Sequence, residues 1–167
     1  MRLFAGLLLV VSSGCADYQF TVNERVVYTP APLFSGYEIA DTALLECVKA
    51  HIQEAQVTAA DQLEVLNCSH AGIEDLSGLQ VFAQLTRVKL SSNAIEEVNA
   101  LADMTALLEL YLDDNKLRSV TELRDLLELR MLDVAGNAAL RCGDLTAFRN
   151  RSALELVAPE HCQAGEP

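Results

Sequence analysis

The chain repeats one apolar pattern four times, at a fixed interval of 22 residues. A leucine opens each copy, at Leu63, Leu85, Leu107 and Leu129. Seven further columns keep the same interval, and they begin in the first copy at Leu66, Cys68, Ala71, Ile73, Leu76, Leu79 and Phe82. Because a unit this short cannot bury its apolar face alone, the period indicates a stacked array in which each copy packs on its neighbours.

Each copy has two halves with different local patterns. The first half alternates apolar and polar residues, as in Leu110-Tyr111-Leu112, which predicts a short strand with one face inward. The second half, such as residues 95–106, has an apolar residue at about every third position, which favours short helical or 3₁₀ turns. One strand per copy, always running in the same direction, makes a narrow parallel sheet.

A polar column follows the predicted strands, with Asn93, Asn115 and Asn137 in the last three copies and Ala71 in the first. A buried amide is costly unless it is hydrogen-bonded, so an asparagine at this position needs backbone partners. An all-helical bundle is the alternative to a stacked array, and it does not explain this column.

These columns resemble the leucine-rich repeat pattern L-x-x-L-x-L-x-x-N-x-I/L in its 22-residue form, over residues 63–150. The resemblance implies an α/β solenoid with a short parallel sheet, in which Asn93, Asn115 and Asn137 point inward and bond the backbone after each strand. Ala71 and Ala139 depart from the pattern. Both lie in terminal copies, where atypical residues are expected because one flank lacks a neighbouring repeat.

An open stack needs a cap at each end to cover its core. Residues 41–62 predict a helical N-terminal cap, because Asp41 is a favourable N-cap and an apolar stripe follows it, formed by Leu44, Val48, Ile52 and Ala55. Residues 151–167 predict a C-terminal cap. With the residues just before them, they resemble the cysteine-bearing C-terminal flank of many extracellular repeat proteins.

Four of the five cysteines lie in or beside the predicted caps. Sequence alone permits three pairings of four cysteines. The coil geometry that the resemblance implies brings one pair together at each end and predicts the disulfides Cys47–Cys68 and Cys142–Cys162. Each would close a loop of about 20 residues, for which the chain-entropy model gives about 3 kcal/mol of stabilisation. Buried free thiols are the alternative.

The first 14 residues are typical of a secretory signal, with Arg2, an apolar run over 3–11 and small residues before Cys15. The run is too short to span a membrane, which takes about 20 apolar residues. Cys15 resembles the cysteine of a bacterial lipoprotein box, which is lipidated and becomes the mature N-terminus. Ala16 after it implies the outer membrane if the host is Gram-negative. An ordinary cleaved signal is the alternative, and residues 15–40 are expected to form a small hairpin or a flexible tether.

Solenoids of this kind bind through the outward-facing strand residues of their concave side. Because neighbouring strands lie about 4.8 Å apart, Arg87 can meet Glu109, and Lys89 can flank Tyr111. Tyr111 is the preferred anchor, since tyrosine is enriched among residues that dominate binding energy. A solvated face with compensating charges is the alternative for any single residue. The predicted partner-binding residues are Arg87, Lys89, Glu109, Tyr111, Asp113, Met131 and Asp133.

Other classes of function find little support. The formal charge of −12 argues against nucleic acid and anionic lipid as partners. Asp113, Asp114 and Asp133 could attract a cation, but no calcium-binding loop is present. The histidines His51, His70 and His161 have no recognisable nucleophile beside them, and neither a phosphate-binding glycine loop nor zinc spacing occurs. We therefore predict no catalytic residue, no metal and no cofactor.

The sequence thus predicts a monomeric, lipid-anchored protein of the bacterial cell envelope that binds another, unidentified protein through its concave face. Its membrane contact would be the N-terminal lipid. Two alternatives remain open: a structural envelope component without a dedicated concave ligand, and a surface-exposed binder of host proteins.

Overall fold

A computed structural model describes residues 20–22, 25–28 and 31–163. The chain divides into two compact units, Met1–Pro32 and Leu33–Pro167. In the first unit, β1 (Phe20–Val22) and β2 (Arg25–Tyr28) form an antiparallel pair, which is the hairpin alternative. The predicted signal and Cys15 lie outside the described residues. No helix within the described ranges is both long and apolar enough to cross a membrane.

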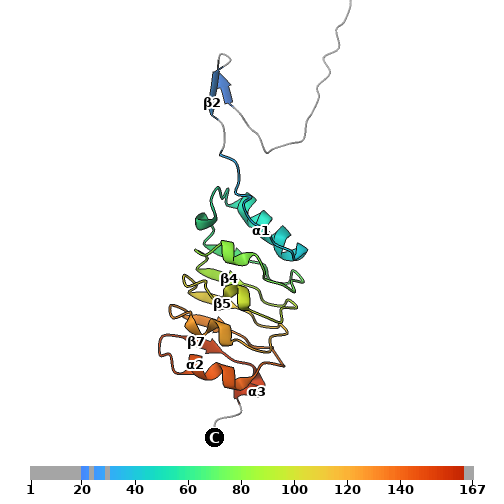
Figure 1. Cartoon of the computed structure of the whole chain (residues 1–167), viewed down its shortest axis with the longest axis vertical. Coiled ribbons are helices and arrows are strands. Elements are labelled where there is room, and N and C mark those ends of the chain that lie inside the picture. The colour runs from blue at the N-terminus through green and yellow to red at the C-terminus, as the bar shows by residue number, and fades with distance from the viewer. Residues whose placement is uncertain (1–19, 23–24, 29–30, 164–167) are drawn as a thin grey trace, which may run out of the picture. The chain divides into compact units, whose positions relative to one another are not determined.

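The second unit is built on a sheet of five parallel strands that follow one another in chain order. Each coil, meaning one copy of the repeat, contributes one strand, and the cap after the fourth coil contributes the fifth. Figure 1 shows the coils stacked between α1 at one end and α2 and α3 at the other. The strands are β3 (Val65–Asn67), β4 (Arg87–Lys89), β5 (Glu109–Tyr111), β6 (Met131–Asp133) and β7 (Glu155–Val157).

The return half of each coil is a short 3₁₀ turn, as the three-residue spacing predicts. These turns cover Leu79–Val81, Asn99–Leu101, Thr121–Asp125 and Cys142–Leu145, and the last continues into α2 (Thr146–Arg149). The core runs between the strands and these turns. Its layers repeat from coil to coil, and each column contributes fully buried side chains, such as Leu66, Val88, Leu110 and Leu132 on the strands.

The asparagine column forms the predicted internal ladder. Asn115 Oδ1 accepts a hydrogen bond from the Ile95 N–H at 3.1 Å, and its Nδ2 donates to the carbonyl oxygens of Leu90 and Leu112. Each asparagine therefore reaches back to the preceding coil as well as to its own. This geometry explains Ala71, because the first coil has no preceding coil to bond.

Both caps are in place. Asp41 Oδ1 accepts from the Leu44 N–H at 2.9 Å and starts α1 (Thr42–Glu54), which buries Leu44, Val48 and Ile52. Ala55 is exposed at the end of the helix, so its assignment to the apolar stripe is wrong: the helix ends before another turn can face the core. Within the described residues, the C-terminal cap contains β7 and α3 (Glu160–Gln163).

The two predicted disulfides are present. Cys47 in α1 is bonded to Cys68 in the first coil, with the Cα atoms 5.8 Å apart. Cys142 in the fourth coil is bonded to Cys162 in α3, with a Cα separation of 5.1 Å. Each bond therefore ties a cap to the coil that it covers.

Residues 33–40 differ from the expected tether, because they pack on the array. The Phe34 N–H donates to the Val57 carbonyl, and the Phe34 ring meets Phe82 edge-on at 5.9 Å. Gly78 allows the segment to approach closely: its φ is +98°, and an added Cβ would lie 2.1 Å from the Glu38 carbonyl oxygen. The boundary of the folded array therefore lies near residue 33 and not near residue 41.

The fourth coil departs from the repeat at one position. Leu117 is fully buried in the third coil, but Ala139, which stands in the same column, is exposed. Leu140 is buried in its place. The Leu140 N–H donates to the Asn137 carbonyl at 3.1 Å and closes a tight turn, which moves the inward position one residue along the chain.

Candidate functional site

The outward residues of the five strands form one continuous surface, called here the sheet face. On each of the first four strands a buried residue lies between two side chains that are exposed or half-buried. The strands are in register, so Val65, Arg87, Glu109, Met131 and Glu155 form one row across the sheet. A parallel row contains Asn67, Lys89, Tyr111, Asp133 and Val157.

A bidentate ion pair lies near the centre of this face. Arg87 donates from Nε and Nη2 to the two carboxylate oxygens of Glu109, both at 2.6 Å. Two parallel bonds of this kind fix the relative orientation of both groups. The hydrogen bonds from Arg87 hold the pKa of Glu109 below its ordinary value, and the same contact raises the pKa of Arg87.

Tyr111 is held by this pair and by Lys89. Its hydroxyl donates to Glu109 Oε2 at 3.3 Å, while the Lys89 ammonium lies 5.0 Å from the centre of its ring. Partial burial, followed by the negative charge of Glu109, raises the pKa of the Tyr111 hydroxyl. The tyrosine is therefore neutral and oriented, with its ring only partly covered.

The acidic side of the sheet face lies toward the C-terminal coils. Ser91 Oγ donates to Asp113 at 2.5 Å, and Asp133 accepts from the Ala135 N–H at 3.0 Å. Burial, helped by the charges of Asp113 and Asp114, raises the pKa of Asp133. Met131 lies beside Glu109 in the register of β5 and β6. The structure thus places all seven predicted partner-binding residues on or at the edge of one surface.

Besides Val65 and Asn67 on β3, three members of this surface were absent from the predicted set. Glu155 and Val157 belong to β7, which the 22-residue period misses because Glu155 follows its partner Met131 by 24 residues. The alternation Leu154-Glu155-Leu156 is the pattern that could have identified them. Alternation also places Ser91 at an outward position after β4, but its bond to Asp113 depends on how two turns approach each other.

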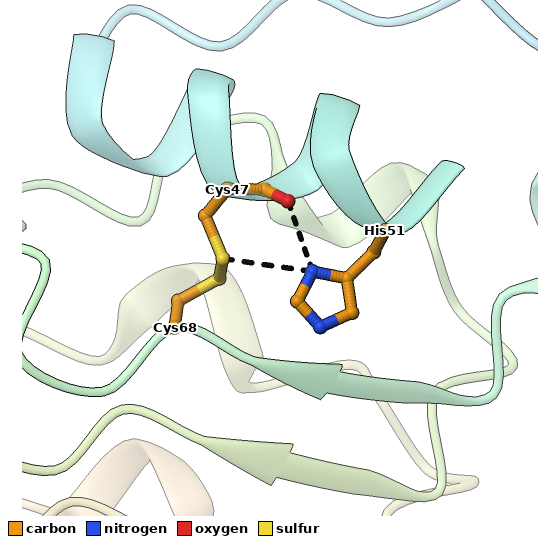
Figure 2. Close-up of side chains that lie close together, drawn as sticks. All are labelled: Cys47, His51 and Cys68. Atoms are coloured by element: carbon orange, nitrogen blue, oxygen red, sulfur yellow. Dashed lines mark hydrogen bonds between the residues drawn. A yellow bond between two sulfur atoms is a disulfide. The ribbon is translucent and has the colours of Figure 1, made fainter. Parts of the chain in front are cut away.

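The edge of β3 is covered by a histidine of the cap helix (Figure 2). His51 Nδ1 lies 2.9 Å from the Cys47 carbonyl oxygen, and the Asn67 N–H donates to His51 Nε2 at 3.2 Å. A carbonyl can only accept, so Nδ1 is the donor in the first contact, and Nε2 is the acceptor for the Asn67 N–H. The bond to His51 Nε2 satisfies the backbone N–H of Asn67 on the edge strand β3, on the side where no other strand pairs with it.

Metal-binding groups gather in two places within the described part of the chain. One contains Cys47, His51 and Cys68, and the other contains Cys142, His161 and Cys162. In both, the two sulfurs are joined in a disulfide, so neither set offers the thiolate that a metal needs. Each set is a covalent link between a cap and the coil beside it, called here a clasp.

Two solved structures from Listeria monocytogenes have a similar architecture. An internalin matches 71% of this chain and 43% of its own, with 22% identity and a TM-score of 0.60. Internalin C2 matches with 25% identity and a TM-score of 0.61, over 70% of this chain and 53% of its own. The chain thus spans about half the length of either internalin.

No protein-family model and no curated protein matches the chain by sequence. The fold rests on the structure itself and on its neighbours. Five parallel strands in register, an inward asparagine ladder and the internalin neighbours together identify the chain as a leucine-rich repeat solenoid with a disulfide in each terminal cap.

Proposed function

We propose that this chain is a lipid-anchored protein of the bacterial cell envelope that binds another protein through its sheet face. Stacked repeats build extended surfaces, and such proteins commonly use them for protein–protein interaction. The observation that carries the proposal is the Arg87–Glu109–Tyr111 network, because it presents an aromatic side chain already held in one orientation.

Pre-ordering of this kind favours binding. Fixing a flexible side chain at an interface costs about 0.5–1.5 kcal/mol. Arg87, Glu109 and Lys89 are already restrained by each other or by Tyr111 in the free protein, so less of this cost remains on association. Tyr111 would be the central anchor, and Met131 and Val65 the apolar contacts around it. With five short strands, the interface is expected to be of standard or small size.

A triple substitution tests the sheet face. Arg87→Gln, Glu109→Gln and Tyr111→Ser together remove the network while leaving the buried residues of β4 and β5 unchanged. Partner capture from envelope extract should be lost, while the circular dichroism spectrum persists. The matched control replaces another ion pair and another exposed apolar residue: Lys49→Gln, Glu46→Gln and Leu127→Ser. Capture that survives the first triple variant, or that the control abolishes equally, would refute the sheet face as the binding site.

The lipid anchor is a separate part of the proposal, supported by the sequence around Cys15. Replacing Cys15 by serine removes the thiol that would accept the lipid. The wild-type protein should partition into the detergent phase of a Triton X-114 extract, and the Cys15→Ser variant into the aqueous phase. Equal partitioning of the two proteins would rule out lipidation at this residue.

A further inference from the structure

A pocket of about 710 Å³ lies where the third and fourth coils turn away from their strands. Its lining shares no residue with the partner-binding set of the sheet face. Its lining combines small residues with three cationic residues. The lining residues are Glu96, Asn115, Lys116, Arg118, Gly136, Ala138, Ala139 and Arg141.

The pocket coincides with the local departure of the fourth coil. The turn closed by the Leu140 N–H and the Asn137 carbonyl draws Leu140 inward and leaves Ala139 outside. Ala138 takes the position that Lys116 has in the third coil, so the long side chain of one coil is followed by a methyl group in the next. The atypical residues of the last repeat, Ala138 and Ala139, therefore line the pocket.

The residues that line this pocket carry a net positive charge, whereas the whole chain is negatively charged. The chain has 24 acidic and 12 basic residues, yet the lining of this pocket contains three cationic residues, Lys116, Arg118 and Arg141, and one acidic residue, Glu96. The Arg141 N–H donates to the Arg118 carbonyl at 3.2 Å, which keeps the two arginines on adjacent coils side by side. The backbone thus brings these two residues together, and Lys116 completes the cationic part of the lining.

These cations are only weakly neutralised. Arg118 lies 3.5 Å from Glu96, and its side chain is 73% exposed; Arg141 lies 3.4 Å from Asp144 and is 68% exposed. Exposed pairs of this length contribute little free energy and exchange readily with other anions. Among the residues that the structure describes, Lys116 has no carboxylate within 4.0 Å.

We propose that this pocket is a second binding site, which takes an acidic peptide segment whose carboxylates pair with Lys116, Arg118 and Arg141. The two guanidinium groups can each bind a carboxylate through two parallel hydrogen bonds. The methyl groups of Ala138 and Ala139 accommodate the methylene groups of glutamate side chains. Glu96, which also lines the pocket, would accept a hydrogen bond from a peptide N–H.

Binding of a labelled oligoglutamate peptide, measured by fluorescence anisotropy at low and physiological salt, tests the site on the whole folded chain. The wild-type protein should bind, and added salt should weaken binding. Lys116→Gln, Arg118→Gln and Arg141→Gln together should weaken it roughly tenfold, because three exposed ion pairs are lost. The matched control, Lys49→Gln, Arg124→Gln and Arg130→Gln, removes the same charge elsewhere and should leave binding close to that of the wild type.

A second variant tests the pocket without changing charge. Ala138→Phe fills the pocket at an exposed position and should also weaken binding. The proposal is overturned if oligoglutamate does not bind, if both charge variants lose affinity equally, or if tripolyphosphate binds more tightly than the peptide. The sheet-face variant at Arg87, Glu109 and Tyr111 should keep the peptide affinity, so failure here leaves the proposed function untouched.

Discussion

Replacement of Asn115 by alanine should destabilise the solenoid by an amount that the hydrogen bonds allow us to work out. The Ile95 N–H loses its acceptor, and leaving a buried donor unsatisfied costs about 1–3 kcal/mol. The carbonyls of Leu90 and Leu112 each lose one donor but keep a second from Asn93 and Asn137, so each contributes less than about 1 kcal/mol. The expected total is about 2–4 kcal/mol.

Urea denaturation followed by circular dichroism measures this loss as a lower midpoint at an unchanged slope. Asn99→Ala is the control, because Asn99 is exposed and its side chain, among the described residues, bonds only that of Glu97. It should change the free energy of unfolding by less than about 0.5 kcal/mol. If Asn115→Ala costs no more than Asn99→Ala, the ladder does not hold neighbouring coils together and the reasoning fails.

Three further predictions concern the N-terminal clasp and two carboxylates. Replacing Cys47 and Cys68 by serine should lower the free energy of unfolding by about 3 kcal/mol under non-reducing conditions, and an unchanged urea midpoint would contradict the clasp. Burial raises the pKa of Asp41, but hydrogen bonds from four backbone N–H groups lower it by more. The folded pKa of Asp41 therefore lies below the unfolded value near 3.8. The stability that it contributes is present above that pH and is lost as pH falls through the folded pKa. Thermal melts of Asp41→Ala in acid should therefore show a flatter pH dependence than wild type. Asp133 has the opposite sign, because burial and nearby carboxylates raise its pKa and its ionisation costs stability as pH rises through the folded value. Asp133→Asn should raise the melting temperature at neutral pH and not in acid, and a lowered value at neutral pH would count against this account.

Periodicity predicted the parts of the fold that repeat. A column repeated in four coils sets the strand register, so the Arg87–Glu109 pair could be foreseen from spacing. The asparagine ladder was foreseen from the resemblance to leucine-rich repeats. The disulfides followed from the same geometry, since each cap must cover one terminal coil. The pattern recurs at a fixed interval, so each strand residue lies beside the equivalent residue of the next coil.

The parts that do not repeat were harder to foresee. Phe34 packs on Phe82 across 48 residues, and no period marks that contact. In the fourth coil the buried position of the column moves from Ala139 to Leu140, and this shift depends on a turn whose hydrogen bond forms only in the folded coil. On the sheet face, alternation identified which side chains point outward, but the 22-residue period missed β7, because that strand lies off the interval.

Site-specific photo-crosslinking in intact cells tests the central claim most directly. A benzophenone side chain placed at Tyr111, in the middle of the sheet face, should form a covalent product with another protein on irradiation. The same probe at Leu127, which is 75% exposed and outside the sheet face, should give no such product. A crosslink at Leu127 with none at Tyr111, or equal products at both positions, would contradict recognition through the sheet face.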